Sequence, residues 1–169
     1  MDIYKRDFLL TGVGLALPGA LLHAENEKAD LPAIGSRLPL EALPLLNGEV
    51  LNHQQLKGQW LVLYYWASWC PFCAQQTPEM QKLHEKVRNK GMTVLGISID
   101  KQLQNAKTHF QKHGYNFDSV WLNPELKTVI YKPRSIPTTL IFNLEEKLVQ
   151  AEKGQMFSEE IENLSKYVM

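Results

Sequence analysis

The chain contains only two cysteines, Cys70 and Cys73, and two residues separate them. They stand where an apolar run, Trp60–Trp66, gives way to a segment with helical character. At this spacing one turn of helix holds the second sulfur beside the first, so the two thiols can close a disulfide with little backbone movement. The pair therefore predicts thiol–disulfide exchange.

The two sulfurs are expected to have different roles, because Cys70 would begin the helix and Cys73 would lie one turn inside it. Unpaired N–H groups and the positive end of the helix dipole lower a thiol pKa from about 8.5 towards 7 or below. Cys70 is then the nucleophile that attacks a substrate disulfide, and Cys73 is the resolving thiol that displaces the mixed disulfide. Oxidation of a partner dithiol is the same path run backwards.

Metal binding is the main alternative for this pair. A structural zinc site needs about four ligands, and the chain has only two cysteines. The next candidate, His84, would lie roughly 16 Å from Cys73 along a helix. We expect no metal and no cofactor, although a copper carrier that uses the pair stays open as a binding module. A peroxiredoxin-like peroxidase is disfavoured because no threonine lies three residues before Cys70.

Composition is that of one ordinary globular domain. The 169 residues are 44% hydrophobic, enough for a single core. Acidic and basic residues number 18 each, and no basic stripe indicates a nucleic-acid partner.

The first 24 residues read as a secretory signal peptide. Lys5 and Arg6 precede an uncharged stretch at 9–22, which is too short for a comfortable membrane span, and Ala24 is the expected cleavage point. The order Lys-Arg-Asp-Phe-Leu also resembles a twin-arginine export signal. Both routes end in the periplasm, an oxidising compartment. An uncleaved segment would be the only membrane contact.

The rest of the chain divides into a linker at 25–34 and one domain at 35–169. Asn47-Gly48 is a hairpin turn, and Glu49–Asn52 is its return strand. Further strands are expected at Trp60–Trp66, Thr93–Ile99, Thr138–Phe142 and Lys147–Gln150. Helices are expected near Cys70–Asn89 with a kink at Pro78, at Leu103–His113, near Glu125–Tyr131, and at Glu159–Val168 with Ser158 as its cap. This order indicates an α/β fold with a mixed sheet and helices on both faces.

The stretch from Trp66 to Cys73, Trp-Ala-Ser-Trp-Cys-Pro-Phe-Cys, and the later Ile136-Pro137-Thr138-Thr139 together resemble the thioredoxin-like proteins of the TlpA/ResA type. Leu46-Asn47-Gly48 and Leu56-Lys57-Gly58 resemble the β-hairpin that this subgroup adds ahead of the core. The resemblance runs from about residue 35 to the C-terminus. It implies a thioredoxin-like mixed sheet flanked by helices, with an added N-terminal β-hairpin.

The resemblance also implies a substrate site and a function. Pro137 matches the family's cis-proline opposite the cysteines, and the substrate backbone is expected to pair with Ile136. Trp69 and Phe72 flank the pair as an apolar docking rim. Isoleucine at 136 is similar to thioredoxins and favours a reductant over a disulfide-introducing oxidant, which stays the alternative. Expected partners are exported proteins with disulfides or thiols, such as apocytochromes before haem attachment, and a membrane thiol–disulfide carrier that supplies electrons.

Two departures from the family pattern concern the second thiol. Thioredoxins bury a carboxylate six residues before the first cysteine, where this chain has Tyr64; ResA-like proteins carry a glutamate three residues after the second, where it has Gln76. Glu79 is close in sequence and is expected to be a solvated helix charge, with partial substitution as the alternative. We therefore expect a high Cys73 pKa and slower reduction than in carboxylate-bearing relatives.

Overall fold

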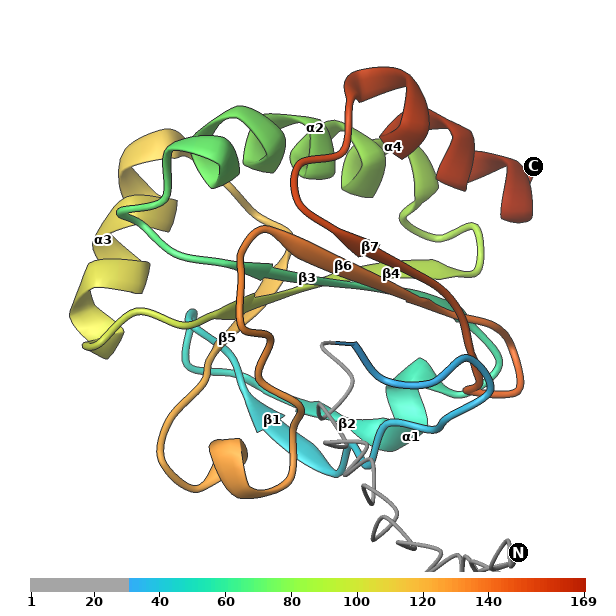
Figure 1. The fold of residues 1–169 in the computed structure, drawn as a ribbon, viewed down its shortest axis with the longest axis horizontal. Helices are drawn as coiled ribbons and strands as arrows, with labels where there is room; N and C mark the ends of the chain where they lie inside the picture. The colour runs from blue at the N-terminus through green and yellow to red at the C-terminus, as the bar shows by residue number, and fades with distance from the viewer. Residues whose placement is uncertain (1–30) are drawn as a thin grey trace, which may run out of the picture.

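The computed structural model describes residues 31–169, so the predictions for the signal peptide and for linker residues 25–30 lie outside the described part. A five-stranded mixed sheet runs through the centre in the order β5-β4-β3-β6-β7 (Figure 1). Its strands are β3 (Trp60–Trp66), β4 (Met92–Ser98), β5 (Asp118–Trp121), β6 (Thr138–Phe142) and β7 (Leu148–Lys153). β3 is parallel to β4 and antiparallel to β6, β4 is parallel to β5, and β6 is antiparallel to β7.

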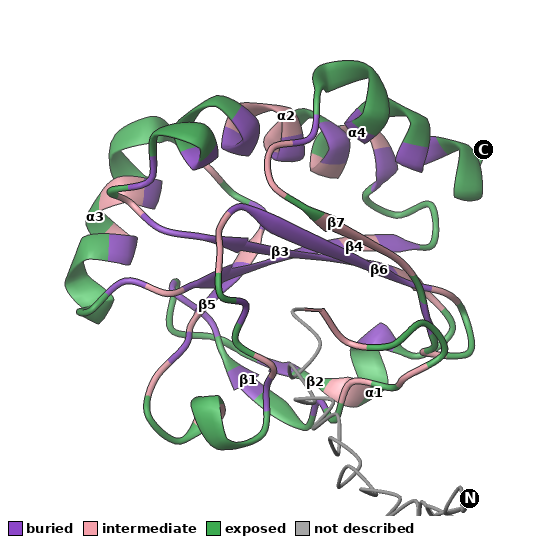
Figure 2. Cartoon of the chain, in the orientation of Figure 1, coloured by how far each residue is buried: buried purple, intermediate pink, exposed green. Residues whose placement is uncertain are grey.

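The central strand β3 is the apolar run that leads to the cysteines. Every residue from Leu61 to Trp66 is buried, because helices cover one face of the sheet and the N-terminal hairpin covers the other (Figure 2). A strand buried on both faces needs apolar side chains at every position, which explains why the run has no alternation. The predicted central strand is confirmed.

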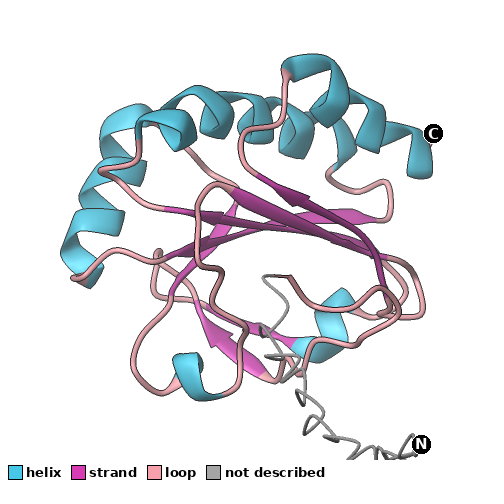
Figure 3. Cartoon of the chain, viewed as in Figure 1, coloured by secondary structure: helices cyan, strands magenta, loops and turns pink. Residues whose placement is uncertain are grey.

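Three helices lie on one face of the sheet: α2 (Pro71–Val87), α3 (Leu103–His113) and α4 (Ser158–Leu164) (Figure 3). β3, β4 and β5 are parallel and follow one another in one direction across the sheet. Crossovers between parallel strands are almost always right-handed, so the helices α2 and α3 that form them share a face. The helix α2 continues through Pro78. No helix in residues 31–169 is long and apolar enough to cross a membrane.

The opposite face is covered by the predicted hairpin and by two short helical turns. The hairpin pairs β1 (Ala42–Pro44) with β2 (Val50–Asn52), and the turns are α1 (His53–Leu56) and the 3₁₀ turn η1 (Leu126–Thr128). The sheet is thus flanked by helices as predicted, but its longer helices all lie on one face. Leucines of the hairpin form a second core against the sheet, with Leu43 almost fully buried.

The N-terminal part of the domain also protects both edges of the sheet. Leu45 forms a bridge with Val120 of β5, and Leu46 N–H donates to the Ser119 carbonyl at 2.7 Å. On the other edge, Gly35 N–H donates to the Leu148 carbonyl at the start of β7, also at 2.7 Å. Unpaired N–H and C=O groups of an edge strand can pair with another chain. These contacts occupy some of the edge groups of β5 and β7.

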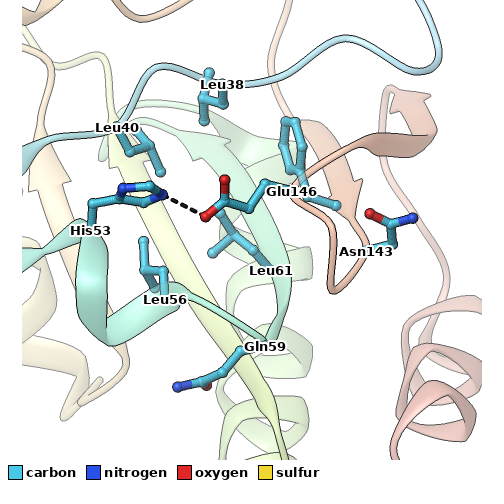
Figure 4. Close-up of a pocket in the computed structure, with 9 residues that line it drawn as sticks. Leu38, Leu40, His53, Leu56, Gln59, Leu61, Asn143 and Glu146 are labelled. Carbon is cyan, nitrogen blue, oxygen red and sulfur yellow. Dashed lines mark hydrogen bonds and ion pairs between the residues drawn. The ribbon is translucent and has the colours of Figure 1, made fainter.

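A polar contact fastens the hairpin to the β6–β7 turn. His53 Nε2 lies 2.5 Å from Glu146 Oε1, over a small pocket lined by leucines (Figure 4). Arg37 lies 3.5 Å from the other carboxylate oxygen of Glu146. The pocket is on the hairpin side of the sheet, opposite the face that carries α2.

Four sequence predictions differ from the structure. The strand β5 was assigned no element, because Asp118 and Ser119 interrupt its apolar pattern. The predicted helix at 125–131 is only the turn η1, before which Asn123 Oδ1 accepts the Leu126 N–H at 2.7 Å. Ser158 does not cap α4: the cap is Phe157, whose N–H donates to the Glu160 carboxylate at 2.7 Å. The last strand, β7, continues to Lys153, beyond the predicted end at 150.

Candidate active site

The two cysteines form a disulfide at the start of α2. Cys70 is the N-cap residue, Pro71 is the first helical residue, and the Cα atoms of Cys70 and Cys73 lie 5.2 Å apart. Proline suits this position because an N–H at the first helical residue has no acceptor within the helix, so its absence costs no hydrogen bond. Both cysteines are buried, with 4% and 1% of their surfaces exposed. Cys70 is therefore the more accessible of the two, as the predicted nucleophile must be.

A backbone donor already points at the first sulfur. Cys73 N–H donates to Cys70 Sγ at 3.1 Å, and this N–H is one of the unpaired donors of the first helical turn. After reduction, the same donor and the helix dipole would favour the thiolate of Cys70 over its thiol.

The loop before β6 brings the predicted substrate-pairing residues to the disulfide. The Ile136–Pro137 peptide bond is cis, as the resemblance implied. The Ile136 carbonyl oxygen lies 3.9 Å from Cys70 Sγ, although 66 residues separate the two in sequence. Pro137 is buried and Ile136 is half-buried, so part of Ile136 faces solvent beside the sulfur.

Two exposed aromatic side chains flank the disulfide. Trp69 is 63% exposed and Phe72 is 56% exposed, which fits the predicted apolar rim. Trp66, by contrast, is fully buried, donates from Nε1 to Ser119 Oγ at 3.2 Å and packs on Phe110. The structure thus brings together all six predicted site residues, whose roles in exchange stay predictions.

Tyr64, six residues before Cys70 where the thioredoxin pattern has a carboxylate, is fully buried. Its hydroxyl lies 3.0 Å from Thr77 Oγ1, and the Thr77 hydroxyl donates to the Cys73 carbonyl at 2.7 Å. Burial raises the pKa of Tyr64 far above its ordinary value, so the phenol stays neutral. This position supplies hydrogen bonds to the first turns of α2 and no proton-accepting charge.

Gln76 is also neutral and fully engaged. Its side-chain amide donates to Thr139 Oγ1 at 3.1 Å, and its carbonyl accepts the Met156 N–H at 2.9 Å. Glu79 was expected to be a solvated charge; it is half-buried, with 22% of its side chain exposed, and pairs with Lys82 at 2.8 Å. Across residues 31–169, no group of three or more His, Cys, Asp or Glu side chains gathers as a metal site.

Sequence reasoning missed one buried carboxylate close to the site. Asp100 follows β4, is 1% exposed, and accepts hydrogen bonds from the Ser68 N–H, the Ser68 hydroxyl and the Ser98 hydroxyl. Because β3 and β4 are parallel, the residues after them meet at the same edge of the sheet. The sequence signal that could have revealed Asp100 is its place just after β4, because Ser68 stands at the matching place after β3, two residues before Cys70.

Comparisons with known proteins agree with this geometry. The sequence pattern of the AhpC/TSA family matches residues 34–151. The chain is 24% identical to "Thiol-disulfide oxidoreductase ResA" of Halalkalibacterium halodurans over 173 residues, covering 99% of this chain and 98% of the relative. Identity to the protein of the same name from Bacillus subtilis is 26% over 156 residues, covering 90% and 87%.

A solved structure has the same fold. The thiol:disulfide interchange protein of Chlorobium tepidum superposes with a TM-score of 0.72 at 22% identity, covering 82% of this chain and 99% of that one. The predicted thioredoxin-like fold is therefore confirmed. The chain therefore belongs to the AhpC/TSA family, has a thioredoxin-like fold and is similar to oxidoreductases of the ResA type.

Proposed function

We propose that the protein is an exported thiol–disulfide oxidoreductase that reduces disulfides in other exported proteins. The observation that carries the proposal is the buried Cys70–Cys73 disulfide at a helix N-terminus, 3.9 Å from the Ile136 carbonyl of the cis-proline loop. The oxidoreductase class also has the support of the ResA relatives. The periplasmic location is inferred from the pattern of residues 1–24.

In the reducing direction the cycle starts from the dithiol. The Cys70 thiolate attacks one sulfur of the substrate disulfide, a mixed disulfide forms, and the other substrate sulfur leaves as a thiolate. Cys73 then loses its proton and attacks Cys70 Sγ, which releases the second substrate thiolate and closes the Cys70–Cys73 disulfide. Two electrons have passed to the substrate, whose thiolates take up the proton released by Cys73 and a proton from water, and a membrane dithiol carrier restores the starting state.

Substrate recognition uses the surface around the sulfur. An extended substrate segment would pair its backbone with Ile136, whose carbonyl lies beside Cys70. Trp69 and Phe72 would contact apolar side chains on either side of the substrate cysteine. Apocytochromes, whose cysteines must be reduced before haem attachment, are a fitting substrate class.

Two measurements test the proposal. Cys73→Ala should accumulate mixed disulfides with exported proteins in cells, because the resolving thiol is gone. Cys70→Ala is the matched control and should accumulate none. The reduction potential of the pair should lie near −270 mV, the approximate value for thioredoxin. A value near −120 mV, typical of strong oxidants, would instead indicate a protein that introduces disulfides.

A further inference from the structure

Asp100 carries a negative charge in the interior beside the cysteine loop. The Asp100 carboxylate accepts hydrogen bonds from three groups: the Ser68 backbone N–H at 3.1 Å, the Ser68 hydroxyl at 2.6 Å and the Ser98 hydroxyl at 2.8 Å. A carboxylate anion accepts in this way, and hydrogen bonds to it are about twice as strong as neutral ones. Among the residues that the structure describes, no Lys, Arg or His forms an ion pair with it.

The network fixes the short loop that leads to the reactive sulfur. Ser68 stands two residues before Cys70, and Cys70 N–H closes a turn onto the Ala67 carbonyl at 3.2 Å. From the 3.1 Å bond and standard backbone dimensions, the Asp100 carboxylate lies within about 12 Å of Cys70 Cα. Ala67 and Cys70 at the two ends of this loop are buried, Ser68 is half-buried, and only Trp69 faces solvent.

The charged and titratable groups around Asp100 leave its charge in place. His109 on α3 packs on Trp66, and burial lowers the pKa of His109 against the smaller opposing effect of Asp100. The imidazole is therefore mostly neutral at pH 7. Lys101, the next residue in the chain, is exposed to solvent, and Trp121 donates only to the Asp100 backbone carbonyl.

We propose that Asp100 is a positioning residue for Cys70: through Ser68 it fixes the cysteine loop, and its charge shifts the pair towards the disulfide form. The charge acts on the reduced state, where Cys70 is a thiolate, and repels it. The disulfide carries no charge and is unaffected. A destabilised dithiol is a stronger reductant, so this inference rests on the proposed function and gives it a structural cause.

Coulomb's law sets the expected size of the effect. We take this upper limit of about 12 Å as the separation of the two charges. With an effective dielectric constant of about 20, two unit charges at that separation shift an equilibrium roughly tenfold. For a two-electron couple, a tenfold change corresponds to about 30 mV.

The test is the equilibrium of the purified protein with dithiothreitol and glutathione buffers. Asp100→Asn keeps the shape of the side chain and removes its charge, so its equilibrium should move about tenfold towards the dithiol, or about 30 mV upward. Glu85→Gln is the matched control, because it removes an exposed carboxylate from α2; it should stay within about twofold of the wild type. An Asp100→Asn shift no larger than that of Glu85→Gln overturns the inference.

A second variant covers the case in which Asp100→Asn does not fold. Ser68→Ala removes the 2.6 Å hydrogen bond but keeps the charge, which is then less compensated. Its equilibrium should move towards the disulfide; no shift, or a shift towards the dithiol, overturns the inference. If the wild-type protein itself neither equilibrates with these buffers nor reduces a disulfide substrate, the proposed function fails, whatever the variants do.

Discussion

At the scale of single residues, the surroundings of the resolving thiol are neutral. Tyr64, Thr77 and Gln76 all form hydrogen bonds near Cys73, and none carries a charge. Cys73 must lose its proton before it can attack the mixed disulfide. Without a nearby base, that proton has to pass to water or to the leaving substrate thiolate, and we therefore expect resolution to be slow.

Gln76→Glu tests this interpretation. The new carboxylate would still accept from the Met156 N–H, and it would accept from the Thr139 hydroxyl in place of the amide donor that Gln76 offers. It would lie one helical turn from Cys73. Burial should raise its pKa above the unfolded value of about 4.3. Stability should therefore match the wild type below about pH 4 and fall as pH rises through the folded pKa, by about 3 kcal/mol at pH 8. Exchange at pH 8 should accelerate, by up to roughly a hundredfold.

The measurements are urea unfolding at several pH values and the rate of reduction of a small disulfide. Gln75→Glu serves as the control, because Gln75 is exposed and adjacent in sequence. It should change neither the pH dependence of stability nor the rate. Equal rates for Gln76→Glu and the wild type would show that deprotonation of Cys73 does not limit exchange.

At the scale of elements, the position of Trp66 beneath the site depends on a glycine in the neighbouring strand. A Cβ at Gly96 would lie 2.7 Å from Ser119 Oγ and 2.9 Å from Trp66 Nε1. These two atoms form the hydrogen bond that joins β3 to β5 across β4. Any side chain at Gly96 therefore displaces Trp66 or Ser119, and Trp66 lies at the end of the strand that leads to the cysteine loop.

Gly96→Ala should destabilise the protein by about 1–3 kcal/mol, the usual cost of overpacking a core. The second substitution Ser119→Ala removes the closest clashing atom, so the double variant should lose less stability than the two single variants added together. Denaturant unfolding of all four proteins gives the coupling, expected at roughly 0.5–3 kcal/mol. Strict additivity would mean that the clash is relieved elsewhere.

At the scale of the whole molecule, the sequence predicts the parts whose pattern is local. β3, α2 and the hairpin turn have strong local signals, and the structure has all three. The edge strand β5 was missed because its polar residues are held in a strand by pairing with β4 and by a hydrogen bond from the hairpin, and neither contact is local in sequence. Asp100 was missed for a similar reason: only the parallel pairing of β3 and β4 brings it to Ser68.

The redox direction of the whole molecule has a consequence for its stability. In a reductant, the folded protein must favour the disulfide over the dithiol more strongly than the unfolded chain does. The oxidised protein should therefore have the larger free energy of unfolding. The loop that the Cys70–Cys73 bond closes is short, and the chain-entropy relation gives about 2 kcal/mol for it at 25 °C. The repulsion between Asp100 and a Cys70 thiolate acts in the same direction, since it destabilises only the folded dithiol.

Urea unfolding of the oxidised and the reduced protein therefore measures direction without any substrate. We expect the oxidised form to have the higher midpoint, by an amount that corresponds to about 2 kcal/mol or more. In Asp100→Asn this difference should shrink. The substitution removes the repulsion from the folded dithiol and so stabilises the reduced form, but it relieves no repulsion in the oxidised form. A reduced protein more stable than the oxidised one would mean that the fold favours the dithiol, as it does in strong oxidants, and would contradict the reducing direction.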